Sequence, residues 1–448
     1  MVEATSVETA PGKKKIHYAI WIFVACCCIS IGGFGLGMGI MGVYIVPVSQ
    51  AYGITIADFT LPGVSLGIVQ MIMFPIWGQL FKKNARVCFI IGSICFVLTI
   101  LTYVFIQPFP IPGLLLAGAF MGVALPIVFF ISIPTLMTNW FAPKVRGRFL
   151  SISLAFTGVG TFVWAPVFTQ ILMSTDYKFS FTLQAILLAI FLLPACILIK
   201  RSPEEMGLKP YGYDPNDEEE ERLATSEVGV KAKSAFRLVP FYMMFIALAA
   251  VSIGMGFQNT QAAWANDVYA GTDLAASAPF IGAWMISAAA AGDVVGKLAY
   301  GFLADKIGVK VTTNIFLVLF FLCFLCMWFL SHILVFVFIG AFLLGTHNGL
   351  ASVACPLVTR QIFGGADYEK IYARASIGNA IIGSFSMVIV TNAVAAVGGF
   401  KVPGYYFIGI GLVLVLAIVL NIAMTYIGKL KFEPADTAPE QRPSEAAV

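Results

Sequence analysis

The chain has 448 residues, of which 59% are hydrophobic and 11% are charged, and its mean hydropathy is +0.91. Soluble domains carry about 25% charged residues, so this composition excludes a soluble globular protein. The net charge is only +4, and the way the charges are distributed along the chain is more informative than their sum.

Twelve apolar segments are long enough to cross a bilayer, since about 20 apolar residues make one span. In chain order they are residues 18–44, 59–81, 87–106, 111–140, 149–173, 179–199, 241–264, 277–304, 311–330, 333–360, 372–397 and 405–427. The connections between them are short, apart from one polar segment after the sixth. We therefore expect an all-α polytopic membrane protein that lies in the lipid bilayer.

The basic residues are distributed unevenly over this topology. If the N-terminus lies in the cytoplasm, all but three of the 27 Lys and Arg residues lie on the cytoplasmic side. Lys178 and Lys401 lie outside, and Lys297 lies in the membrane. This bias follows the positive-inside rule and predicts a protein of the cell (inner or plasma) membrane with both termini in the cytoplasm. It also accounts for the basic clusters, so no nucleic-acid partner is expected.

The apolar segments divide into two groups of six. We expect a cytoplasmic tail at residues 1–17, a first six-helix bundle at 18–199, a polar cytoplasmic linker at 200–240, a second bundle at 241–430 and a second tail at 431–448. Two halves that rock about a central site are typical of secondary transporters.

Two charged residues lie inside the eighth apolar segment. Asp293 and Lys297 are spaced i, i+4, which places them on one face of a helix. A charged side chain in a span costs about 2.5–3.5 kcal/mol, so such residues are rare and usually face a polar cavity. The pair predicts a protein that handles a charged or proton-linked solute. The alternative is a structural ion pair that only joins helices.

Several uncharged polar side chains are further candidates for the lining of a substrate site. They are Gln258, Asn259 and Gln261 in the seventh segment, His347 and Asn348 in the tenth, Asn379 in the eleventh, and Gln70 and Trp164 in the first half. His347 could also carry a proton. For each of them the alternative is a hydrogen-bonded packing role.

The sequence contains no pattern that indicates an enzyme. It has no paired catalytic carboxylates, no phosphate-binding glycine loop and no His or Cys residues at metal-ligand spacing. Its nine cysteines lie almost entirely in apolar segments and are interpreted as packing residues. We therefore expect neither a cofactor nor a metal. The glycines of the first segment could serve close helix packing or the gating of a cavity.

The loop after the eighth segment resembles a known family motif. Residues 301–310 read GFLADKIGVK, which is similar to the signature loop G-x-L-x-D-[KR]-x-G-[RK]-[RK] of the major facilitator superfamily, with Val309 as the departure. The resemblance implies the fold of that family, with twelve transmembrane helices in two six-helix bundles. It assigns a gating role to Gly301, Asp305, Lys306, Gly308 and Lys310.

Three further stretches resemble the branch of monocarboxylate and oxalate:formate carriers. They are WFAPKVRGR at residues 140–148, which contains Arg146 and Gly147 and is similar to the loop between the fourth and fifth spans of these carriers, SPEEMGLKPYG at 202–212, and the pair Asp293-x-x-x-Lys297. The resemblance implies that the base binds a substrate carboxylate and that Asp293 couples transport to protons. The chain departs from the branch in the first segment, which has no ionisable residue after His17.

These observations predict a secondary active transporter of a small organic anion, a monocarboxylate, that works by alternating access as a monomer. Proton symport and anion exchange stay open as mechanisms, as do import and export. One alternative is an exporter of amphipathic organic compounds, with the many Phe residues lining its cavity. A less favoured alternative is a membrane sensor that transports nothing.

Overall fold

The computed structural model describes residues 17–106, 109–213, 229–364 and 367–430. Over these residues the chain forms twelve helical segments that are long and apolar enough to cross a membrane. The expected all-α fold with twelve spans is confirmed. The first segment is longer than predicted and reaches Tyr52, because the helix ends only where Gly53 adopts a left-handed φ of +66°.

The first six spans form one bundle, called the N-half. Its elements are α1 (Tyr18–Cys28), η1 (Ile29–Gly39) and α2 (Met41–Tyr52) in the first span, then α3 (Ile56–Phe59), α4 (Pro62–Lys83) and α5 (Ala85–Phe105). The fourth span consists of α6 (Pro110–Leu125), η2 (Pro126–Ile131) and α7 (Ser132–Trp140), and α8 (Pro143–Ser174) and α9 (Tyr177–Leu198) complete the bundle.

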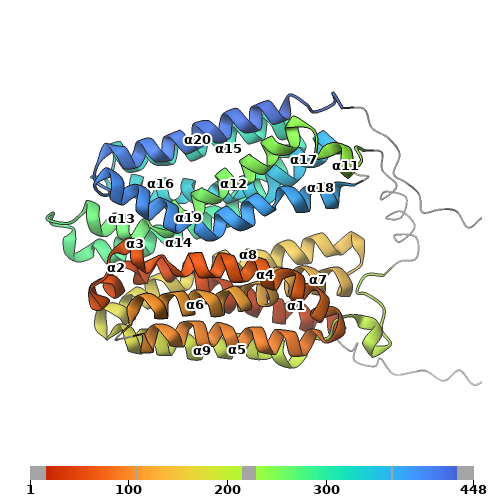
Figure 1. The fold of residues 1–448 in the computed structure, drawn as a ribbon, viewed down its shortest axis with the longest axis horizontal. Helices are drawn as coiled ribbons and strands as arrows, with labels where there is room; N and C mark the ends of the chain where they lie inside the picture. The colour runs from red at the N-terminus through yellow and green to blue at the C-terminus, as the bar shows by residue number, and fades with distance from the viewer. Residues whose placement is uncertain (1–16, 107–108, 214–228, 365–366, 431–448) are drawn as a thin grey trace, which may run out of the picture.

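The last six spans form the second bundle, called the C-half. It contains α12 (Val239–Asn259), α13 (Gln261–Val268), η4 (Ala275–Ser277), α14 (Ala278–Ile307) and α15 (Val309–Phe329). The tenth span comprises α16 (Leu334–Thr346), η5 (Leu350–Ala354) and α17 (Cys355–Phe363). The last two spans are α18 (Tyr368–Ala375) with α19 (Ile377–Val397), and α20 (Pro403–Met424). The two bundles lie side by side in Figure 1.

The first, fourth and tenth spans are interrupted near their middle, and the seventh span is followed at its end by a break, so one span in each group of three carries a break. Three of the breaks are π-helical, at η1, η2 and η5, and the fourth separates α12 from α13 at Thr260. In the first span the break coincides with a glycine-rich stretch, and in the fourth it starts at Pro126, which has no N–H to donate. Short π-helical segments inside longer helices are frequent at functional sites.

The segment between the two halves is attached to both of them at one end of the molecule. The Tyr211 N–H donates to Trp140 O at 2.8 Å, and the Val230 N–H donates to Phe363 O at 2.7 Å. Residues close to both chain termini lie at this same end (Figure 1). We call it the linker side, and the opposite end the far side.

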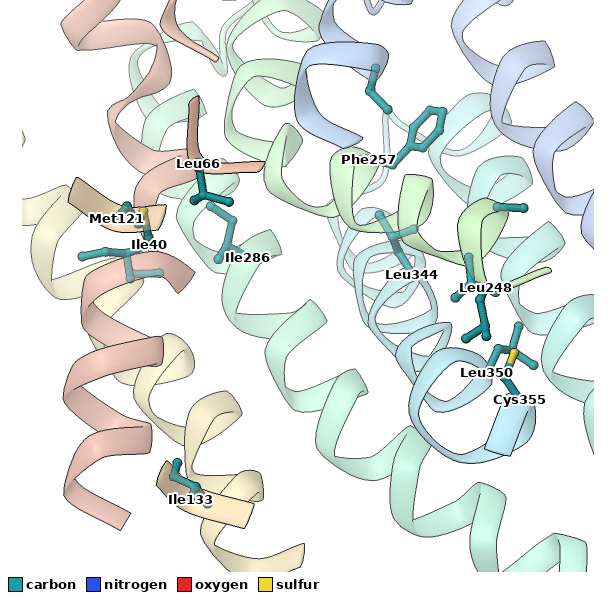
Figure 2. Close-up of a cluster of buried hydrophobic side chains, with 14 of the residues drawn as sticks. Ile40, Leu66, Met121, Ile133, Leu248, Phe257, Ile286, Leu344, Leu350 and Cys355 are labelled. Carbon is teal, nitrogen blue, oxygen red and sulfur yellow. The ribbon is translucent and has the colours of Figure 1, made fainter. Parts of the chain in front are cut away.

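The two halves contact one another from the middle of the spans to the far side. Ser287 of α14 donates to Phe162 O of α8 at 2.9 Å, and the Thr60 and Thr391 hydroxyls lie 3.2 Å apart. A Cβ added to Gly63 of α4 would lie only 2.6 Å from Ser384 O of α19. Small residues thus let backbones of opposite halves approach closely. Buried apolar side chains continue across this boundary (Figure 2).

Replacing Gly63 with alanine is expected to lower the free energy of unfolding by about 1–3 kcal/mol relative to a control variant, because the methyl group overpacks the boundary. The control is Gly411→Ala in α20, where an added Cβ meets no atom within 4 Å. Both changes replace a helical glycine with the residue of highest helix propensity, so the difference between them mainly reports the contact between the halves. Denaturant unfolding in one detergent measures both variants, and equal stabilities would contradict a close contact at Gly63.

Candidate functional site

The charged pair of the eighth span forms an ion pair. Lys297 Nζ lies 2.8 Å from Asp293 Oδ2 on the same side of α14. The Lys297 side chain is 34% exposed and that of Asp293 is 12% exposed. Because both residues lie well inside the span, the exposed surface of Lys297 indicates open space beside it.

The face of α14 that carries the pair is not its lipid-exposed face. Val295, Leu298 and Phe302 are 48%, 63% and 61% exposed, as expected for apolar side chains in contact with lipid. At 3.6 residues per turn they lie on average about 150° around the helix from Asp293 and Lys297. The pair therefore faces the interior of the protein.

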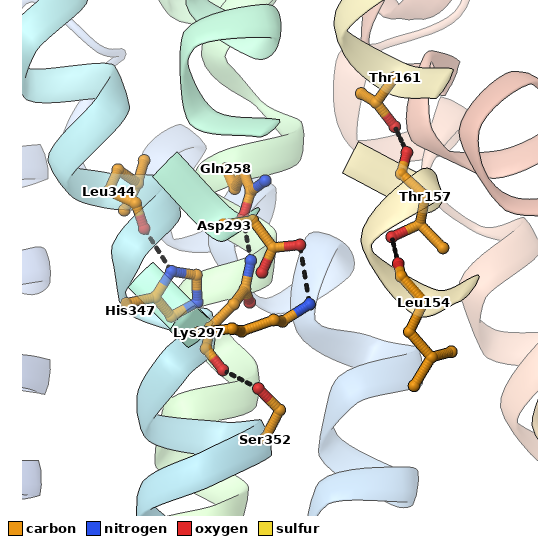
Figure 3. Close-up of polar contacts among 10 residues, drawn as sticks. Leu154, Thr157, Thr161, Gln258, Asp293, Lys297, Leu344, His347 and Ser352 are labelled. Carbon is orange, nitrogen blue, oxygen red and sulfur yellow. Dashed lines mark hydrogen bonds and ion pairs between the residues drawn. The ribbon is translucent and has the colours of Figure 1, made fainter. Parts of the chain in front are cut away.

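The surfaces on either side of the pair are covered by neighbouring helices. On one side α14 packs against α16 so closely that a Cβ on Gly292 would lie 2.0 Å from a backbone oxygen. On the other side a Cβ on Gly158 of α8 would lie 2.5 Å from a Val294 methyl carbon. The Lys297 ammonium points toward the side on which α8 carries Thr157 (Figure 3). The pair thus faces the region between the two halves.

One oxygen of the pair is unsatisfied. Asp293 Oδ1 is buried and accepts no hydrogen bond from any residue that the structure describes. Leaving a buried carboxylate oxygen without a donor is costly, and such groups often have a functional reason. A proton or a water molecule on Oδ1 would relieve the cost.

His347 is packed inside the C-half. Its side chain is fully buried and stacks on Phe320, with ring centroids 5.0 Å apart. Its Nδ1 contacts Leu344 O, and because a carbonyl only accepts, the proton is on Nδ1. Nε2 is then an acceptor for which the described residues provide no donor. A Cβ on Gly254 of α12 would lie 2.5 Å from this nitrogen.

Hydrogen bonds connect α12 to two other spans of the C-half. Asn348 Nδ2 donates to Gln258 Oε1 at 3.0 Å, which joins the tenth span, at a point between α16 and η5, to α12 (Figure 3). The Ser252 hydroxyl donates to Asn379 Oδ1, which joins α12 to α19. Three of the predicted polar residues, Gln258, Asn348 and Asn379, therefore take part in hydrogen bonds between spans of the C-half.

The other polar candidates lie outside this cluster of bonds. Asn259 and Gln261 flank the break in the seventh span, and the buried amide of Gln261 has no hydrogen-bond partner within the described ranges. Gln70 in α4 is buried, and its Oε1 likewise contacts no donor among the residues described. Trp164 packs against Phe191 of α9, with ring centroids 5.8 Å apart, and therefore lies against its own bundle.

The signature loop is partly described. Gly308 ends α14 with a φ of +85°, a conformation that favours glycine, and a Cβ on Gly301 would meet no atom within 4 Å. The Lys306 ammonium lies 4.3 Å from the centre of the Phe302 ring, and Lys310 is exposed. The side chains of Asp305 and Arg146 lie outside the described part of the chain, and Gly147 is described only as a residue of α8.

A row of phenylalanines in the N-half was not singled out by the sequence analysis. Phe34 of η1 lies 4.8 Å from Phe129, Phe129 lies 5.3 Å from Phe130, and Phe130 of η2 lies 6.0 Å from Phe74 of α4, all between ring centroids. The row joins three spans, so no periodicity within one segment could have identified it. The only signal was the general abundance of Phe, which is 39 residues.

Within the described residues, no group of three His, Cys, Asp or Glu side chains could hold a metal ion. The chemistry that the site offers is therefore that of one ammonium, one carboxylate and several amides. An ammonium beside an unsatisfied carboxylate can bind an anion and exchange a proton.

The fold resembles known transporters. The structure of a bacterial homologue of the human lysosomal transporter Spinster, in an inward-facing and unoccupied conformation, has a TM-score of 0.62 at 16% identity and covers 95% of this chain and 100% of its own. A variant of the nucleoside transporter NupG has a TM-score of 0.69 at 11% identity, with 92% and 100% covered. At these identities the likeness shows the fold alone. No curated protein matches the chain.

The sequence itself matches one family model, described as Major Facilitator Superfamily, in two segments at residues 26–282 and 246–447. Together they span nearly the whole chain and both six-helix halves. This match confirms the resemblance carried by the loop at residues 301–310, and it identifies a transporter rather than an enzyme. The chain belongs to the major facilitator superfamily.

Proposed function

We propose that the protein is a secondary transporter of a small organic monoanion, a monocarboxylate, and that Lys297 binds the carboxylate. The observation that carries this proposal is the Asp293–Lys297 ion pair, which faces the region between the two halves with the Lys297 side chain 34% exposed. Charged side chains inside a span are energetically unfavourable, and those that occur there usually have a function.

The pair can couple the anion to a proton. A substrate carboxylate accepts charge-assisted hydrogen bonds from the Lys297 ammonium and competes with Asp293 for it. Asp293 then loses its counter-ion, and a carboxylate in a largely buried position is stabilised by taking up a proton. Its Oδ1, which accepts no bond from the described residues, is a place for that proton. One anion and one proton would enter together.

The charge of the site favours a monoanion over a dianion. Lys297 supplies one fixed positive charge in the middle of the spans. Arg374, the next basic candidate, lies in α18 with its guanidinium 4.3 Å from the Phe236 ring centre, near the linker side. A second carboxylate on the cargo would be left without a cationic partner, which costs binding energy.

Alternating access is supported by the way the halves meet. Their hydrogen bonds lie from mid-span to the far side, so separation of the halves on the linker side would expose the pair there. The positive-inside bias supports a linker side that faces the cytoplasm of a cell membrane. The breaks in four spans provide points at which helices could bend. We propose that one chain, as a monomer, performs the whole cycle.

Uptake of labelled monocarboxylates into proteoliposomes, with and without an imposed pH gradient, tests the function. Uptake that accumulates with the gradient supports proton symport, and uptake that needs a trans-side carboxylate supports exchange. Binding of carboxylates without any flux would instead favour a sensor. Absence of both binding and flux across a carboxylate panel would contradict the proposal. Because a ligand that binds only the folded protein raises its apparent stability, thermal shift measures the binding.

A further inference from the structure

We infer that the preferred cargo is an amphipathic monocarboxylate whose aromatic or bulky apolar body rests on the row Phe34, Phe129, Phe130 and Phe74, while its carboxylate binds Lys297. This inference rests on the proposed function and adds the chemical class of the cargo's carbon skeleton. It follows from the side of the N-half on which the row lies and from its depth.

The face of α4 that carries Phe74 is the face that meets the C-half. Added Cβ atoms on Gly63 and Gly67 would lie 2.6 Å and 2.8 Å from atoms of Ser384 in α19. Phe74 is seven residues beyond Gly67, and residues spaced by seven lie on the same face of a helix. Phe74 therefore points toward the C-half, on the linker side of the contact between the halves.

Phe34 likewise lies on the face of the first span that is turned to the C-half. Gly32 and Gly35 of η1 pack against α9 and α8 of the same bundle, with added Cβ atoms 2.2 Å and 2.7 Å from atoms there. Gly42 follows Phe34 by eight residues, roughly two turns, and so lies on a similar face. A Cβ on Gly42 would lie 2.5 Å from Asn259 O of the C-half.

The row lies at the depth of the charged pair. Phe130 and Lys297 lie the same number of residues before the ends of their spans, which are Trp140 at the end of α7 and Ile307 at the end of α14. Phe74 lies one residue closer to the end of its own helix, which is Lys83 at the end of α4. All three ends are on the linker side, so these side chains lie about 15 Å inside it at 1.5 Å per residue. Phe130 is 42% exposed and the other three rings are half-buried, which leaves ring surface for a ligand.

The N-half and the C-half form the two walls of the region between them, and these walls differ in chemistry. The C-half offers an ammonium and amides, whereas the N-half offers ring faces and edges, together with Thr157 and Thr161, whose hydroxyls donate to their own helix. A small polar anion such as acetate would use only one wall. An aromatic carboxylate would use both, because rings prefer edge and offset contacts with other rings and bury much apolar surface.

A matched set of probes tests the inference: acetate, phenylacetate and the neutral phenylacetamide, measured by thermal shift and by competition with uptake on the full-length purified protein. Phenylacetate is expected to bind about tenfold more tightly than acetate, which corresponds to about 1.4 kcal/mol. Phe130→Ala is expected to remove most of this ratio, because it weakens the binding of phenylacetate far more than that of acetate. Phe34→Leu, which keeps an apolar side chain of similar size, should reduce the ratio in the same direction.

The control is Phe179→Ala, which removes a 56% exposed ring from α9 and should leave both affinities unchanged. Equal affinities for acetate and phenylacetate, or a ratio that Phe130→Ala and Phe34→Leu leave intact, would overturn the inference while the proposed anion function stands. Binding of phenylacetamide as tightly as phenylacetate, unaffected by Lys297→Gln, would instead contradict the proposed function. The two failures are thus distinguishable.

Discussion

Replacing Lys297 with glutamine is expected to lower carboxylate uptake by about a hundredfold or more, with the protein still folded. Removing one partner of a desolvated charge pair typically costs 2–5 kcal/mol, and a hundredfold loss corresponds to about 2.8 kcal/mol. Lys297→Ala should have the same effect, whereas Lys297→Arg, which keeps the positive charge, should retain part of the uptake. Initial rates in proteoliposomes and thermal shift with the same carboxylate measure transport and binding separately.

Two further variants separate substrate binding from a purely structural ion pair. Lys178→Gln, an exposed lysine on the far side, is the matched control and should leave uptake unchanged. The double variant Lys297→Gln with Asp293→Asn removes both charges, so no uncompensated charge destabilises the fold. If the pair had only a structural role in α14, this double variant would recover uptake. We expect it to be stable and inactive. Normal uptake by both Lys297→Ala and Lys297→Gln would contradict the anion site.

Replacing Asp293 with asparagine is expected to abolish pH-driven accumulation while exchange of carboxylates continues. Asparagine keeps the shape of the side chain and a hydrogen-bond acceptor for Lys297, but it cannot take up the proton that the cargo displaces. With one proton per anion, a gradient of one pH unit can drive accumulation of about tenfold, because one unit is worth about 1.36 kcal/mol. The variant should show a ratio near one under the same gradient.

The measurement compares net accumulation with counterflow in the same vesicles. Counterflow needs only binding and the movement of the loaded carrier, so it controls for folding and for substrate affinity. Accumulation by Asp293→Asn equal to that of the parent protein would remove the proton role of Asp293. Loss of counterflow as well would indicate that the residue is needed for carboxylate binding through its effect on Lys297.

Much of the architecture could be predicted before any coordinates. A bilayer requires about 20 apolar residues per span, so twelve spans in two groups of six followed from hydropathy, and the loop at residues 301–310 indicated the superfamily. The spacing of Asp293 and Lys297 predicted that they share a helix face, and they do lie 2.8 Å apart. That this face is turned toward the interior was inferred only from the free-energy cost of charged side chains in a membrane, because the sequence does not show which helix lies opposite.

The sequence by itself determined the features that one helix decides, namely the spans and the spacing that brings Asp293 and Lys297 together as an ion pair. Tertiary structure alone decided the features that need several spans. His347 is enclosed by Phe320 and Gly254, Trp164 lies against Phe191, and the phenylalanine row joins η1, η2 and α4. The physical reason is that local chemistry follows from neighbours in the chain, whereas burial and the composition of a wall between two bundles depend on how helices distant in sequence are rotated and packed.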